Sequence, residues 1–244
     1  PEVHYPPLLP IVLGLVQTLT DDPETASEIS YIIFGTLLIL PYYAIARRVY
    51  GRRVGYVAVA LLLVFPALTV SVLYWGTMSE PLYLVLIYTG LWAFWRALEG
   101  RDPLLYAVAG LMFALAYLTR PEAILYAMVF TALLIAWRAT QRRLRARETW
   151  IGLVAFIGAF TICALPYIVY LHQHTGRWTF SGKVGVTFDL GAAVIERDPA
   201  AYDAATASLD DTGYHTIWFS PQRFRGPGML SAVLSNPAAF ARRI

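Results

Sequence analysis

The sequence predicts an all-α polytopic membrane protein with about six transmembrane helices, an N-terminal interfacial helix and a C-terminal extracytoplasmic segment. Three observations support this fold class. The chain of 244 residues is 58% hydrophobic and only 14% charged, whereas soluble domains carry about a quarter charged residues. Its apolar residues gather in long uncharged runs. Its arginines and its carboxylates segregate into alternate loops between those runs.

Six apolar runs are candidate membrane spans, and three of them reach the length that a bilayer requires, which is about 20 residues in helical form. The long runs are residues 29–46, 54–75 and 149–171, and the shorter ones are residues 81–95, 104–119 and 123–137. A helix of about 15 residues is only about 22 Å long, short of a hydrocarbon core of about 30 Å. We therefore expect either that flanking residues complete the short spans or that the turn at residues 120–122 lies below the membrane surface.

The loop charges predict one orientation. Eleven arginines and three carboxylates, a net charge of +8, lie in three alternate loops: residues 47–53, 96–103 and 138–148. One arginine and six carboxylates, a net charge of −5, lie in the opposite short loops: residues 20–28, 74–80 and 120–122. Because basic loops stay in the cytoplasm, the first set is predicted to be cytoplasmic and the second extracytoplasmic.

The chain divides by composition into an outer-face segment at residues 1–28, a transmembrane helical domain at 29–171 and an extracytoplasmic segment at 172–244. Pro1 opens the chain without an initiator methionine, and residues 235–238 resemble a helix start close to the last residue. We therefore expect a fragment that lacks both natural ends. The single cysteine, Cys163, excludes an internal disulfide. No basic stretch pairs with a polar aromatic face, so nucleic acid is not an expected partner.

Charged residues near the predicted membrane boundary are the first candidates for chemistry. Arg120 and Glu122 occupy the short turn between two apolar runs, where a charge is costly and usually paired or functional. The alternative is a capping box, in which Thr119 caps the next helix and Glu122 bonds back. Glu80 begins another apolar run, where it is a candidate general base, sugar-hydroxyl acceptor or metal ligand. Without such a role it would only complement the helix dipole.

Other polar residues have weaker alternatives. The outer carboxylates Asp21, Asp22, Glu24 and Glu28 fit two helix starts, which is their expected role. His174 follows the last run, and with His4 it is a candidate ligand of a divalent metal ion, although the spacing fixes no third ligand. Lys183 is the only lysine and lies among small residues, so it suits a phosphate or an ordinary surface position.

Five motifs in order resemble the membrane glycosyltransferases of the GT-C superfamily, in the protein-mannosyltransferase-like and aminoarabinose-transferase-like branch (glycosyltransferase family 39-like). They are HYPPLLP at 4–10, ARRVYGRR at 46–53, SEPLY at 79–83, LTRPEA at 118–123, and the stretch from HTGRW at 174–178 to Lys183. Each is weak alone. Together, in the family's order and on the predicted sides of the membrane, they form a more specific pattern.

This resemblance implies transfer of a sugar from a polyprenyl-phosphate carrier to a lipid, glycan or protein acceptor at the outer face of the plasma membrane. An acidic residue of the first external loop would act as the base, so its expected position precedes this chain except for Glu2. Glu80 and Glu2 are therefore the catalytic candidates. The substrate-binding candidates are Arg120, Glu122, Lys183 and Tyr5.

Two other functions compete with this interpretation. A transporter or flippase for a lipid-linked or small polar substrate also needs charged groups at membrane depth, but inverted repeats and broken spans in corresponding halves are not apparent. A non-catalytic membrane scaffold predicts no convergence of Glu80, Arg120 and Lys183.

Overall fold

The computed structural model describes residues 5–65, 79–100, 102–142, 146–182, 207–209 and 216–218. Its helices are α1 (Leu8–Gln17), α2 (Pro23–Tyr50), α3 (Arg52–Leu63), α6 (Glu80–Gly100), α7 (Pro103–Thr119), α8 (Ala123–Thr140) and α9 (Arg147–Thr175). Two strands, β1 (Ala207–Leu209) and β2 (Thr216–Trp218), pair antiparallel with Ser208 opposite Ile217. The predicted all-α membrane class is confirmed by the long apolar helices.

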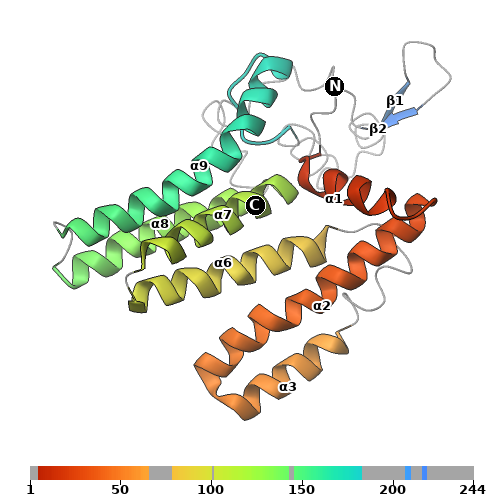
Figure 1. The fold of residues 1–244 in the computed structure, drawn as a ribbon. Helices are drawn as coiled ribbons and strands as arrows, with labels where there is room; N and C mark the ends of the chain where they lie inside the picture. The colour runs from red at the N-terminus through yellow and green to blue at the C-terminus, as the bar shows by residue number, and fades with distance from the viewer. Residues whose placement is uncertain are drawn as a thin grey trace, which may run out of the picture. The chain divides into compact units, whose positions relative to one another are not determined.

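The chain forms two compact units, one of residues 6–167 and one of residues 1–5 with 168–244. Within the first unit α2 and α3 form a hairpin, α2 packs against α6, and α6 packs against α7. The helices α6, α7, α8 and the larger part of α9 lie side by side (Figure 1). Within the same unit α1 packs against α2 and α7.

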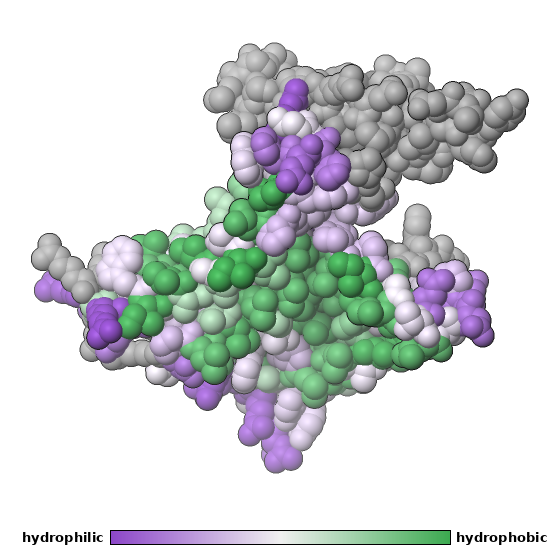
Figure 2. Space-filling view, turned by 45° about the horizontal axis from the view of Figure 1, so that its top comes forward, coloured by the Kyte–Doolittle hydropathy of each residue, from purple (hydrophilic) through white to green (hydrophobic). Residues whose placement is uncertain are grey.

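Four described helices, α2, α6, α8 and α9, are long and apolar enough to cross a membrane. Many large apolar side chains on them are exposed, among them Leu40, Met128, Val154 and Ile162. Figure 2 shows hydrophobic residues across the middle of one face and hydrophilic residues toward its edges. An apolar surface of this extent would be unfavourable in water, and a lipid environment removes that cost.

Flanking residues lengthen two of the three short apolar runs to about the length of a membrane span, which was one of the two expectations for them. α6 has 21 residues and α8 has 18, which correspond to about 32 Å and 27 Å of helix. α7 has 17 residues and reaches only about 26 Å. The helices also extend into the basic loops, so Arg48, Arg96 and Arg138 belong to helix ends.

Local sequence explains the helix boundaries. Asp22 caps α2, because its Oδ2 accepts hydrogen bonds from the Thr25 backbone N–H at 2.7 Å and the Thr25 hydroxyl at 2.9 Å. These bonds, the backbone one first, lower the pKa of the Asp22 carboxyl. The helix-start role expected for Asp22 is confirmed. Gly51 separates α2 from α3 with φ of 88°, a conformation that disfavours residues with a Cβ.

Aromatic rings fill the core of the first unit and fix how α7 lies. Phe113 of α7 stacks on Phe130 of α8 at 5.1 Å and meets Phe156 of α9 edge-on at 5.9 Å. Phe94 of α6 contacts Phe130 and Phe156. At Gly110 the backbone of α7 approaches the Phe156 carbonyl so closely that an added Cβ would overlap it. This packing fixes the middle of α7, the helix that leads into the α7–α8 turn.

Candidate functional site

The α7–α8 turn does not form the capping box that was the alternative interpretation of its sequence. Thr119 is the last residue of α7, and its hydroxyl donates to the Leu115 carbonyl oxygen at 3.0 Å. Arg120 is extended, with φ of −144° and ψ of 126°. Glu122 precedes α8 in a helical conformation and makes no side-chain capping bond. This alternative is wrong because the Thr119 hydroxyl bonds back into its own helix, and the Glu122 carboxylate is left for another partner.

That partner is Arg120, which also reaches the start of α6. Its Nη1 donates to Glu80 Oε1 at 2.5 Å, and its Nε lies 3.7 Å from Glu122 Oε2. The guanidinium carbon lies 5.6 Å from the centre of the Tyr83 ring, within cation–π range. Glu80 and Tyr83 are three residues apart on α6 and therefore share one face of that helix. Two turns separated by 40 residues thus form one charged cluster.

The cluster is partly open to its surroundings. The side chains of Arg120 and Glu80 are each 36% exposed, and that of Glu122 is 59% exposed. Within the described part of the chain, Nη2 of Arg120 and Oε2 of Glu80 make no hydrogen bond. The guanidinium is therefore oriented by its neighbours while one edge stays available. That arrangement can bind a phosphate through nitrogen donors, and the carboxylates can accept hydrogen bonds from hydroxyl groups.

The structure does not test the remaining predicted site residues against this cluster. Glu2, His4 and Lys183 lie outside the described residues, so their part in a shared site stays a prediction. Tyr5 is half exposed and belongs to the second compact unit. Its assignment to substrate binding also stays a prediction.

The histidines at the end of α9 make local contacts. His174 Nδ1 lies 2.8 Å from the Tyr170 carbonyl oxygen, and its ring lies 4.1 Å from the Tyr170 ring. His172 stacks on Trp178 at 4.1 Å with the planes 7° apart. Among the described residues no three histidine, cysteine or carboxylate side chains are grouped to hold a metal ion. Because His4 lies outside the described residues, the metal site at His4 and His174 stays a prediction.

The sequence analysis gave no role in the site to Tyr83 or Tyr126. Tyr83 covers the Arg120 guanidinium, and Tyr126 of α8 lies beside Tyr83. The spacing of Tyr83 from Glu80 was the available signal.

Arg138 is only 2% exposed, and its hydrogen bond is to the Tyr106 hydroxyl at 3.2 Å. It was counted as a loop charge, because sequence alone does not reveal that α8 continues to Thr140.

The long apolar helices define an integral membrane protein, and the charged, half-exposed cluster at two span ends is its candidate site for a polar or charged ligand. The family comparison makes this specific. Residues 4–170 match the dolichyl-phosphate-mannose-protein mannosyltransferase family, and the chain belongs to that family. It is thus a membrane glycosyltransferase by family, as the resemblance implied. No curated protein and no solved structure matches the chain.

Proposed function

We propose that this protein transfers a sugar from a polyprenyl-phosphate-linked donor to an acceptor hydroxyl at the extracytoplasmic face of the plasma membrane. Three observations support the proposal. The family description names a lipid-phosphate-linked sugar as donor. The cluster of Glu80, Arg120 and Glu122 joins two span ends. The loop charges predict that these ends face away from the cytoplasm. The acceptor class, whether lipid, glycan or protein, stays open.

The observation that carries the proposal is how the three nitrogens of the Arg120 guanidinium are partnered. Its Nη1 and Nε face carboxylates, while Nη2 has no partner in the described part of the chain. A guanidinium fork binds two oxygens of a phosphate at once. Holding the fork in advance reduces the side-chain ordering that binding would otherwise require. The cluster carries two carboxylates and one guanidinium, so we expect Glu122, which is 3.7 Å from Nε and more exposed, to turn toward a hydroxyl when phosphate binds.

In the proposed reaction the acceptor oxygen attacks the anomeric carbon of the sugar. The bond from that carbon to the phosphate oxygen breaks, and the electron pair leaves with the phosphate. Arg120 would stabilise the negative charge that develops there, a contribution worth about 10²–10³ in kcat for one well-placed donor. The acceptor proton would pass to a carboxylate. Glu80 is the candidate within the described residues, since its Oε2 makes no hydrogen bond there.

Kinetics of Arg120→Lys in the full-length enzyme test the phosphate role. Lysine keeps the charge but lacks the fork, so we expect folding near normal with a raised donor KM or a lowered kcat. The matched control is Arg147→Lys, an exposed arginine at the start of α9, which should leave both constants unchanged. Normal kinetics together with a lowered melting temperature would assign Arg120 a structural role and remove it from the site.

Glu80→Gln separates two roles for Glu80. The amide oxygen of glutamine can still accept from Arg120 but cannot take a proton at neutral pH. If Glu80 is the base, kcat should fall by about 10²–10⁴ while donor KM stays close to that of the wild type. If Glu80 only orients Arg120, Glu80→Gln should retain most activity, and Glu80→Ala should resemble Arg120→Lys. Retained activity in Glu80→Gln would move the base elsewhere, with Glu2 the next candidate.

A further inference from the structure

A second polar site lies between α2 and α6, far from the Arg120 cluster. A groove of about 90 Å³ is lined by Ala44, Ile45, Arg48, Trp92, Trp95 and Arg96. Glu80 begins α6, and Arg96 lies 16 residues further along the same helix. At 1.5 Å per residue the two positions are about 24 Å apart along the helix axis. The groove is therefore at the other end of the span from the proposed transfer site.

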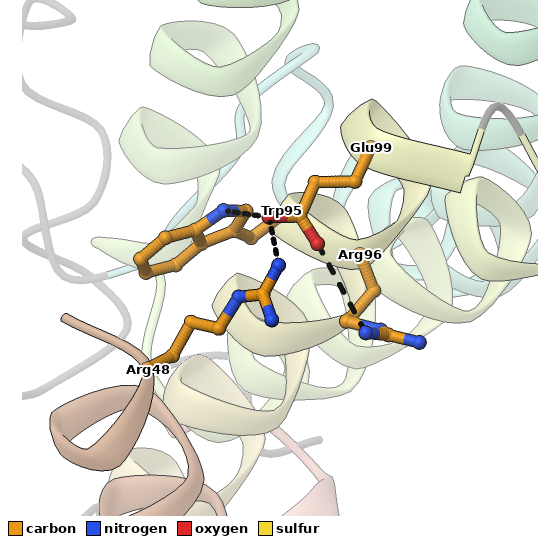
Figure 3. A network of polar contacts seen from close by, with 4 residues as sticks. All are labelled: Arg48, Trp95, Arg96 and Glu99. Carbon is orange, nitrogen blue, oxygen red and sulfur yellow. Dashed lines mark hydrogen bonds and ion pairs between the residues drawn. The ribbon is translucent and has the colours of Figure 1, made fainter. Parts of the chain in front are cut away.

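One carboxylate orients the polar side of this groove (Figure 3). Glu99 Oε1 accepts hydrogen bonds from Arg48 Nη2 at 2.7 Å and from Trp95 Nε1 at 3.1 Å. Arg96 Nη1 is 3.9 Å from Glu99 Oε2, which is beyond hydrogen-bond distance. Both arginine side chains are about half exposed, at 52% for Arg48 and 51% for Arg96. Two cations thus share one anion, and among the described residues Arg96 has no acceptor within hydrogen-bond distance.

The other side of the groove is apolar and continues onto a lipid-facing surface. Ala44 and Ile45 line it on α2, and Leu40, one turn earlier on that helix, is 66% exposed. Trp92 is partly exposed on α6. Tryptophan near a span end is typical of the membrane interface, where the indole ring meets both water and hydrocarbon. The groove therefore presents surplus positive charge next to an apolar path along the helices.

We propose that this groove binds the phosphate headgroup of an anionic phospholipid, with Arg96 as the principal phosphate contact. Arg48 would contribute from its position on Glu99, and an acyl chain would follow the surface at Ile45 and Leu40. Basic pockets between helices at the cytoplasmic side bind such headgroups, and the loop charges predict that this end is cytoplasmic. A free phosphate would gain the arginine contacts but leave the apolar side empty. The inference does not depend on the proposed glycosyl transfer.

The test measures lipid binding to the full-length protein in detergent, with phosphatidylglycerol or phosphatidylcholine of the same acyl chains as probe. Native mass spectrometry gives the retained lipid, and a titration gives the Kd. Wild type should bind phosphatidylglycerol about tenfold or more tightly than phosphatidylcholine, and Arg96→Gln should lose most of that difference. A tenfold change corresponds to about 1.4 kcal/mol, a reasonable share for one charged phosphate contact.

Arg147→Gln is the matched control, because Arg147 is exposed on the same predicted side and its loss removes the same charge. It should bind phosphatidylglycerol like wild type. Equal losses in both variants would indicate a diffuse charge effect and overturn the site. Equal wild-type binding of the two lipids would also overturn it, without any variant. Inorganic phosphate at the same concentration should not displace the lipid, and effective displacement would assign the groove to a soluble anion instead. Each result is independent of transferase kinetics.

Discussion

Among the described glycines, Gly110 is the one where an added Cβ would make the closest contact. Substitution to alanine would place a Cβ into the Phe156 backbone carbonyl of α9. If the contacting atom belonged to a side chain, that side chain could rotate away, but a backbone carbonyl inside a helix cannot. The change therefore requires α7 and α9 to separate locally, and the nearby stacking of Phe113 with Phe156 and Phe130 would be disturbed.

The expected magnitude is the balance of two opposing effects. Alanine improves helix propensity over glycine by about 1 kcal/mol. Overpacking of a well-packed core costs about 1–3 kcal/mol, and contact with a backbone atom favours the upper end of that range. We therefore expect a net loss of about 2 kcal/mol in the free energy of unfolding. For a chain of this size that loss lowers Tm by roughly 4–8 °C.

Gly158→Ala in α9 is the control, because an added Cβ there meets no atom within 4 Å. It should leave Tm unchanged or raise it slightly, since only the propensity gain remains. Thermal unfolding of both variants in the same detergent, followed by circular dichroism, gives the comparison. If Gly110→Ala is as stable as Gly158→Ala, then α7 and α9 do not approach as described. The aromatic core that holds the Arg120 turn would then need revision.

Three further predictions concern stability and topology. Tyr106→Phe removes the hydroxyl to which Arg138 donates a hydrogen bond and should lower the free energy of unfolding by about 1–3 kcal/mol. The double variant with Arg138→Met should recover part of this loss, measured as Tm. If Tm does not recover, the pairing is contradicted. The stabilisation from Asp22, whose pKa is lowered in the folded state, is present above its unfolded pKa of about 3.9 and is lost as pH falls through the folded value. Asp22→Asn should therefore weaken the fall of Tm below about pH 5, and an unchanged profile would exclude the cap as its source. In a cysteine-free background, a membrane-impermeant thiol reagent applied from outside should label Asp21→Cys and not Arg142→Cys, and the reverse pattern would invert the orientation.

Much of the fold followed from local sequence. A run of about 20 apolar residues leaves the backbone no satisfactory arrangement in lipid except a helix, so the spans were readable without tertiary information. Asp22 was readable as a helix start because a cap bonds within its own turn. The lengths of the helices could be predicted from the sequence less well. Charged residues such as Arg96 and Arg138 interrupt hydropathy although the helix continues through them.

The sequence likewise predicted one part of the candidate site, and only the tertiary structure decided the rest. Sequence marked Glu80, Arg120 and Glu122 as costly charges at span ends, and it left open whether Arg120 pairs with one of these carboxylates or with a lipid phosphate. Thr119 shows why, since one hydroxyl had two competing acceptors and only the turn geometry decided between a cap and a bond to Leu115. The ion pair of Arg120 with Glu80 spans 40 residues, and the Arg48–Glu99 pair spans 51. Such contacts depend on how whole helices pack, a property of the tertiary structure that no local pattern encodes.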